Sequence, residues 1–182
     1  MAVYVALLRG INIGPHKRIK MDALRDSFAA MGFGAVQTYI QSGNVVFKAG
    51  KGSSATLSQK IEKALLQDFG FAVPVICRSQ DELREAISRN PFFKDKSIDE
   101  SKLHVTFLSQ APETTALKKV EALASAPDRF CCVGEQIYLY FPNGFSQSSM
   151  FRSPWERALS VVTTTRNWRT VNALYQMCLD CK

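Results

Sequence analysis

The chain of 182 residues is 46% apolar and 21% charged, which is typical of a globular protein of one or two domains. No window approaches the roughly 18 apolar residues of a membrane span, and no basic flank precedes the first apolar run, so we expect neither a signal peptide nor a membrane protein. The net charge of +7 lies mainly in residues 1–52, with seven basic and two acidic residues, and in residues 136–182, with five and two.

The first half of the chain predicts a strand, a helix, a hairpin, a helix and a strand, followed by the start of another helix. In the hairpin, Gly43 and Asn44 both tolerate the positive φ of a tight turn. Pro74 argues for an edge position of the last strand or for a bulge. Ser79 and Glu82 have the spacing of a capping box. The predicted ranges are Val3–Leu8, 21–31, 35–49, 57–69 and 71–78.

The second half repeats the pattern of strand, helix, hairpin and helix. A strand is expected at 103–109, a helix around 117–124 and a hairpin that turns at Gly134 and Glu135. A capping box at 153–156 and a last helix from about Asn167 to Asp180 follow. We therefore predict an α+β fold of two tandem ferredoxin-like, or split βαβ-type, subdomains related by internal duplication. The expected domains are 1–90 and 102–182, with a linker at 91–101.

The opening loop, RGINIGPHKRIK at 9–20, is longer than the fold requires. From strand start to hairpin start, the first half takes 33 residues and the second 26, and much of the excess falls in this loop. It matches neither a P-loop nor a dinucleotide fingerprint. What remains is a helix N-terminus, which attracts anions, preceded by polar and basic residues. These are Arg9, Asn12, His16, Lys17, Arg18 and Lys20. Anion binding and a plain basic loop both remain open.

Two other segments offer polar side chains. In the hairpin, turn chemistry is the favoured explanation of Ser42 and Asn44, but it explains Gln41 less well. In TTTRNWRTV, at 163–171, Thr164 or Thr165 is expected to cap the last helix. Arg166 and Arg169 lie three residues apart and could reach one anion together, or they could be solvated helix charges beside a core Trp168.

Other functional classes have little support in the sequence. The third-strand motif of RNA-recognition domains is absent, because SGNVVF has Asn and Val where aromatic residues would stack on bases. Two histidines, His16 and His104, have no metal-ligand spacing, and the vicinal cysteines of FCCV point to opposite faces of a strand. We therefore expect no metal and no cofactor. Five cysteines, an odd number, favour a reducing compartment and a cytoplasmic location.

Four segments in this order, VALLRGINIG, IKM at 19–21, TYIQSGNVVF and TTTRNWRTV, resemble a bacterial family called domain of unknown function 1697. LHVTFLS and IYLYFPNGF also fit, and the resemblance extends from Val3 to about Tyr175. It implies a cytosolic protein of about this length with two tandem α+β subdomains of related build, and it implies no function. Pro15 departs from the Gly or small residue expected there. It stiffens the loop and removes one N–H from any phosphate cradle.

Three hypotheses for function follow. The first is that the three motif segments form one positive site for a phosphate-bearing ligand, either a nucleic acid or a phosphorylated small molecule such as a nucleotide. Its residues would be Arg9, Asn12, Lys17, Lys20, Gln41, Arg166 and Asn167. The second is an enzyme acting on a small anionic metabolite, with His16 or His104 perturbed. The third is a structural or interaction module in which Arg9, Gln41 and Arg166 are buried and paired. The sequence does not decide between these three hypotheses, and it does not indicate the oligomeric state.

Overall fold

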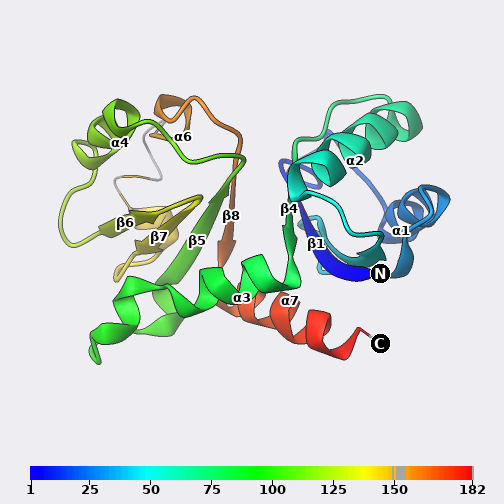
Figure 1. Cartoon of the computed structure of the whole chain (residues 1–182). Coiled ribbons are helices and arrows are strands. Elements are labelled where there is room, and N and C mark those ends of the chain that lie inside the picture. Colours follow the sequence, from blue (N-terminus) through cyan, green and yellow to red (C-terminus); the bar gives the residue numbers. More distant parts are fainter. Residues whose placement is uncertain (149, 151–154, 182) are drawn as a thin grey trace. The chain divides into compact units, whose positions relative to one another are not determined.

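The computed structural model describes residues 1–148, 150 and 155–181 (Figure 1). The chain forms two compact units, one of Met1–Glu85 with Ala173–Lys182 and one of Ala86–Asn172. The segment expected to be a linker, 91–101, contains one 3-10 helix and the start of a second. The division into domains 1–90 and 102–182 stays a prediction, which truncated chains would test. Within the described residues, no helix combines the length and the apolar character needed to cross a bilayer.

The first unit contains a four-stranded antiparallel sheet in the order β2-β3-β1-β4. Because β3 lies between β1 and β2, this is a split βαβ arrangement. The strand β4 is at the edge, as Pro74 predicted. The elements are β1 (Ala2–Leu8), α1 (Met21–Ala30), β2 (Gly34–Tyr39), β3 (Asn44–Ala49), α2 (Ser54–Phe69), β4 (Val75–Ser79) and α3 (Gln80–Ser88).

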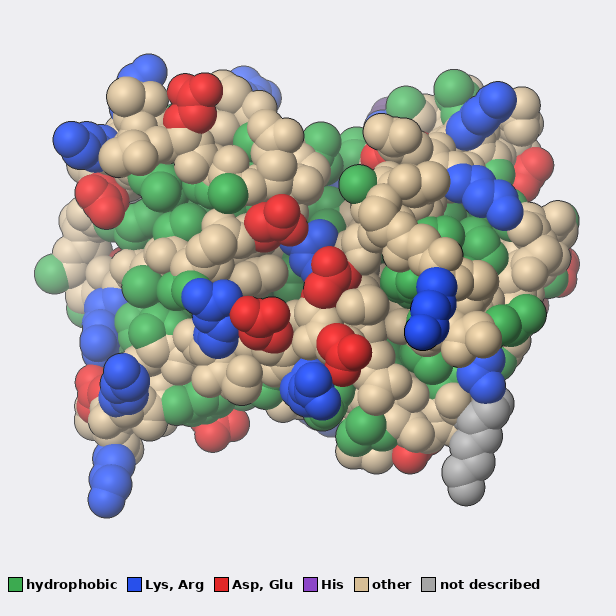
Figure 2. Space-filling view, in the orientation of Figure 1, with side chains coloured by type: hydrophobic (Ala, Val, Ile, Leu, Met, Phe, Trp, Pro, Cys, Tyr) green, Lys and Arg blue, Asp and Glu red, His purple; other side chains and the backbone are tan. Residues whose placement is uncertain are grey.

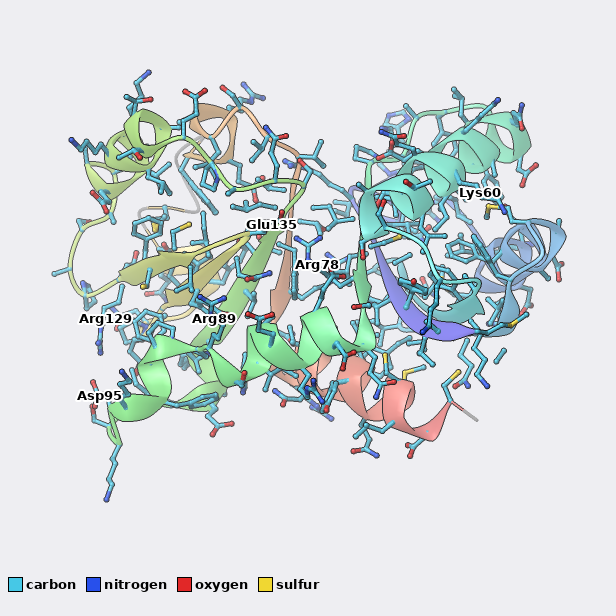
Figure 3. All side chains as sticks on the ribbon, in the orientation of Figure 1. Lys60, Arg78, Arg89, Asp95, Arg129 and Glu135 are labelled. Atoms are coloured by element: carbon cyan, nitrogen blue, oxygen red, sulfur yellow. The ribbon has the colours of Figure 1, made fainter. Side chains whose placement is uncertain are left out.

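The second unit has a sheet of the same build, in the order β6-β7-β5-β8. The predicted α+β fold of two similar subdomains is therefore confirmed. The elements are η1 (Pro91–Lys94), η2 (Glu100–Lys102), β5 (Leu103–Leu108), α4 (Thr114–Glu121), β6 (Arg129–Val133), β7 (Gln136–Tyr140), η3 (Phe145–Gln147), α6 (Trp155–Ala158), β8 (Thr163–Asn167) and α7 (Trp168–Asp180). Arg129 on β6 forms an ion pair of 2.9 Å with Asp95, which follows η1 (Figure 3).

One prediction for this unit was wrong. The segment TTTRN was interpreted as the start of the last helix, whereas it forms the edge strand β8. Three consecutive β-branched threonines suit a strand that pairs with β5. The cap of α7 is consequently Asn167, whose Oδ1 accepts a hydrogen bond of 2.8 Å from the backbone N–H of Thr170. Ser153 and Pro154 of the predicted capping box lie outside the described residues.

Equivalent backbone hydrogen bonds show how closely the two units correspond. In the first unit, Leu8 donates to the Gly43 carbonyl at 2.8 Å and Arg9 to the Pro74 carbonyl at 2.9 Å. In the second unit, the same two bonds run from Leu108 to Glu135 and from Ser109 to Val162, both at 2.9 Å. Residues of β1 and β5 that differ by 100 in number therefore occupy equivalent places. This register allows the two units to be compared residue by residue.

The helices form where capping and periodicity predict them. The Oγ of Ser53 accepts a hydrogen bond of 3.1 Å from Thr56 N–H at the start of α2, and Gly70, at φ 76°, ends it. Helices α1 and α2 cover one face of the first sheet (Figure 1). That face contributes Tyr4, Ala6 and Leu8 to the core. In the second unit, α4 and α6 cover the equivalent face, and Trp155 of α6 belongs to its core. In each unit, the packed core therefore supports the sheet, and the loops extend from the ends of its strands.

Candidate functional site

The opening loop of the first unit, residues 9–20, is anchored near both ends by apolar side chains. Ile11 and Ile19 are buried in the same core as β1. Between them, the six residues from 13 to 18 are all exposed. The loop is therefore an ordered projection whose anchors belong to the core and whose outer residues face solvent.

Asn12 holds this projection together. Its Nδ2 donates to the Ile19 carbonyl at 3.0 Å and to the Gln41 carbonyl at 2.9 Å, and its Oδ1 accepts from Ile19 N–H at 2.9 Å. Its own N–H donates to the Lys17 carbonyl at 3.0 Å. The structure thus brings Asn12 and Gln41 together, as two members of the predicted site. The Asn12 amide joins the loop to the hairpin and closes the loop on itself, which is a positioning role.

The cations of the loop differ in their exposure and in their contacts. Lys17 has a left-handed backbone, φ 53°, and its Nζ donates to the Ala72 carbonyl at 2.9 Å. Arg18 and Lys20 are exposed. Arg9 is half-buried at the end of β1, and its N–H donates to the Pro74 carbonyl. Lys17 and Asn12 both carry positive φ, a conformation that costs non-glycine residues free energy and is concentrated at functional sites.

The hairpin turn lies directly against the base of the loop. A Cβ on Gly43, whose φ is 81°, would lie 2.7 Å from the Cβ of Leu8 and 2.9 Å from Cδ1 of Ile11. Asn44 is buried, and its Nδ2 donates to the Tyr39 carbonyl and to Ser42 Oγ, both at 3.0 Å. Turn chemistry thus explains Asn44, while Gln41 is exposed. The second turn residue with positive φ is Ile40, at 49°, and not Asn44.

The N-terminus of α1 differs from those of other long helices in the described chain. Side chains cap α2, α3 and α7: Ser53, Ser79 and Asn167 each accept a backbone N–H. The N-cap of α1 is Lys20, which makes no side-chain cap hydrogen bond. The equivalent helix of the second unit, α4, is also uncapped by a side chain, but its N-cap is the acidic Glu113. A cation before a helix N-terminus opposes the helix dipole, whereas an anion complements it.

The chain segment that includes the loop is mainly positively charged. Residues 1–61 contain two acidic residues, Asp22 and Asp26, against eight Lys and Arg. Asp22 forms an ion pair with Arg25 of the same helix. On the face of the molecule shown in Figure 2, cationic and anionic side chains are interspersed among apolar ones, so that face as a whole carries no field of a single sign. Four of the eight cations, Arg9, Lys17, Arg18 and Lys20, lie in the opening loop.

Arg166 and Asn167, also predicted as site residues, have partners inside the second unit. Arg166 is buried on β8 and donates from Nη1 to Thr164 Oγ1 at 2.8 Å and to the Thr165 carbonyl at 2.9 Å. Burial lowers the pKa of its guanidinium to about 10, so the group stays cationic at neutral pH. Asn167 caps α7 with its side chain. Both residues therefore have structural roles in this unit.

Sequence analysis missed the counterpart of Arg166 in the first unit. Arg166 pairs in register with Val105, and Arg78 on β4 pairs in the same way with Val5 (Figure 3). Arg78 is also buried, and its Nη1 donates to the carbonyl of the preceding residue, Cys77, at 2.9 Å. The duplication did not reveal this equivalence, because TTTRN was interpreted as a helix start and β8 was therefore not aligned with β4.

The two histidines lie in different surroundings. His16 is exposed in the opening loop. His104 is half-buried on β5, where its ring stacks on Phe145 at 5.1 Å between centroids and lies 5.5 Å from Phe141. Burial lowers the pKa of His104 below its ordinary 6.5, and a hydrogen bond to the Lys102 backbone opposes the shift. His104 is therefore largely neutral at pH 7.

The cysteines carry free thiols, and burial raises the pKa of Cys77 and of Cys178 to about 12. Both are therefore protonated at neutral pH and are poor nucleophiles. Among the residues that the structure describes, no three or more His, Cys, Asp or Glu side chains are grouped so that they could hold a metal ion.

Comparisons with known proteins give a family and a fold. A family model described as a protein of unknown function (DUF1697) matches residues 1–138. Among solved structures, that of the conserved bacterial protein SP0830 from Streptococcus pneumoniae is similar, with a TM-score of 0.77 and 22% sequence identity. The match covers 97% of this chain and 98% of that one, and it shows a shared fold. No curated protein matches the chain.

Proposed function

The chain belongs to the DUF1697 family of proteins of unknown function, and we propose that its opening loop and first hairpin bind a phosphate-bearing ligand, a nucleic acid or a nucleotide. Arg9, Lys17, Lys20 and Gln41 of the predicted set would face the ligand, with Arg18 beside them. Asn12 would position the loop. Arg166 and Asn167 have partners within the second unit and are not part of the proposal.

The internal repeat is the observation that supports this function. Both units leave their first strand through the same pair of backbone hydrogen bonds. From there, the second unit reaches its helix α4 through the five residues 109–113, whereas the first takes the twelve residues 9–20 to reach α1. The shorter connection contains no Lys or Arg and ends in Glu113. The fold therefore closes without the seven additional residues and without their positive charge.

Those additional residues carry a cost that the shorter loop avoids. Left-handed backbone at Asn12 and Lys17 is unfavourable by about 1 kcal/mol for a typical non-glycine residue, although Asn tolerates it better. Lys20 at the uncapped start of α1 opposes the helix dipole, and Asp22 in the first turn offsets part of that cost. A bound phosphate would relieve the second cost, because it neutralises the cations and accepts hydrogen bonds from the free N–H groups of the first helical turn.

The experiment is a thermal-shift titration with short RNA, short DNA and mononucleotides at low and high salt. A ligand at a hundred times its Kd should raise the free energy of unfolding by about 2.7 kcal/mol. The double variant Arg18→Gln/Lys20→Gln should lose most of the shift. The matched control is Lys118→Gln/Lys119→Gln, which removes the same charge from exposed positions on α4 of the second unit and should keep it.

The salt dependence separates the two ligand types. A shift with polymers that falls steeply with salt indicates contacts with several backbone phosphates. A salt-resistant shift with one mononucleotide indicates a pocket. If the loop variant and the α4 control lose the ligand-induced thermal shift equally, binding depends only on the net charge of the protein. That result would refute the loop site. Absence of a shift with every ligand would leave the opening loop as a connection.

A further inference from the structure

Two isoleucines, one in the loop and one in the hairpin, are exposed to solvent. Ile13 is 76% exposed and Ile40 is 52% exposed. They flank the bond between Asn12 and Gln41, which fixes the loop against the hairpin at 2.9 Å. Ile40 also has a φ of 49°, which is unusual for a β-branched residue. A polar residue, or Asn or Gly at position 40, would serve packing and turn formation better.

The shape of the projection favours an extended partner over a small one. Ligands of small size bind in concave sites that bury most of their surface. Here, the six residues from 13 to 18 are exposed, and a Cβ on Gly10 or Gly14 would meet no atom within 4 Å. A mononucleotide on such an open loop would stay mostly in solvent. A polymer can instead lie along the loop and contact several of its cations at once.

The apolar residues indicate which polymer fits. Proteins that bind single strands stack bases on exposed aromatic rings, whereas proteins that enter the minor groove of a duplex insert apolar side chains, Ile, Leu and Met among them. In the described part of the first unit, none of the exposed large apolar residues is aromatic. These residues are Met1, Ile13, Ile40, Leu66 and Leu179.

We infer that the opening loop binds double-stranded nucleic acid, with Ile13 in a groove and the neighbouring cations on the flanking phosphates. The inference rests on the proposed function and narrows its ligand. Arg18 and Lys20 contact the backbone and set the affinity, which is independent of sequence. Ile13 supplies an apolar contact to the bases and sugars that line the groove, and Ile40 lies at the rim of the same contact.

The test is fluorescence anisotropy with a 20-base-pair duplex, as DNA and as RNA, with each single strand and with a mononucleotide, over a salt series. Co-sedimentation with vesicles that contain phosphatidylglycerol is measured beside it. The full-length protein should bind one duplex at least tenfold more tightly than its strands. Ile13→Ala should weaken duplex binding by about tenfold with an unchanged salt slope, since it removes apolar area and no charge. Arg18→Gln should reduce the slope of log K against log salt by about 0.9. Leu66→Ala, the matched apolar truncation on α2, should change neither quantity.

Each other outcome overturns the inference in a distinct way. Equal binding of duplex and single strands, or an unchanged affinity of Ile13→Ala, would refute the groove contact and leave phosphate binding intact. If the protein binds a mononucleotide but none of the polymers, duplex binding is refuted and the proposed binding of a phosphate-bearing ligand is retained. Binding only to vesicles that contain phosphatidylglycerol would assign the isoleucines to a lipid surface instead. Absence of binding to every probe would remove the proposed function together with the inference.

Discussion

The substitution Gly43→Ala tests how the hairpin supports the opening loop. The added Cβ would lie 2.7 Å from the Cβ of Leu8 and 2.9 Å from Cδ1 of Ile11, both of which are buried. The Cβ of Leu8 is fixed to the backbone of β1 and cannot rotate away, so the turn must move. The φ of 81° adds a second cost for an L-residue.

The two costs can be separated by a control. Left-handed backbone costs alanine about 1 kcal/mol, and overpacking of a well-packed core costs about 1–3 kcal/mol. We therefore expect Gly43→Ala to lower the free energy of unfolding by roughly 2–4 kcal/mol. Gly70 ends α2 with a similar φ of 76°, but a Cβ there would meet nothing within 4 Å. Gly70→Ala should therefore lose only about 1 kcal/mol.

The assay is urea unfolding of both variants and the parent protein, followed by circular dichroism. The difference between the variants measures the contact of the turn with Leu8 and Ile11, because the backbone cost is common to both. The same preparations should show weaker ligand binding for Gly43→Ala, since a displaced turn loses the bond from Asn12 to Gln41. Equal destabilisation of the two variants would refute the close approach and with it the account of how the hairpin positions the loop.

Three further outcomes are expected. Asn12→Gly keeps the positive φ but removes three side-chain hydrogen bonds, so it should lower the free energy of unfolding by about 1–3 kcal/mol. It should also speed hydrogen exchange at the Ile19 amide, and unchanged exchange would contradict the positioning role of Asn12. Ile40→Asn should raise the free energy of unfolding by about 0.5–1 kcal/mol in urea unfolding, because Asn tolerates left-handed backbone, and a loss of stability would show that Ile40 packs better than its exposure indicates. Burial lowers the pKa of His104, so below its ordinary value of 6.5 the unfolded chain takes up a proton that the folded chain resists, and the stability present above that pH is lost as pH falls. His104→Phe should therefore reduce the change in urea midpoint between pH 7 and pH 5, and an unchanged pH dependence would contradict the burial of this imidazole.

Most elements could be predicted because their signals are local. Apolar periodicity and Gly70 defined α2, the spacing of Ser79 and Glu82 defined the cap of α3, and turn residues defined both hairpins. The duplication could also be predicted, since it needs only the order of these elements. The strand β8 was missed because its residues also suit a helix start, and pairing with β5 decided between the two.

The candidate site was predictable in its residue types and less so in their roles. Asn12 was grouped with the ligand-binding residues, whereas its amide joins Ile19 and Gln41, 7 and 29 residues away. No local pattern reveals such a bond. Arg78 was overlooked for a similar reason, as its equivalence to Arg166 follows from strand register.

Apart from β8, the sequence by itself determined the order of strands and helices, and it also determined the repeat and the excess of positive charge in the first 52 residues, because each follows from residue type and spacing along the chain. The tertiary structure decided which polar groups hold the fold and which face solvent. In it, the Asn12 side chain bonds the backbone of the hairpin, Ile13 and Arg18 are exposed, and Gly43 lies against Leu8. The physical reason is that hydrogen bonds and close contacts form between residues tens of positions apart, and only packing brings those residues together.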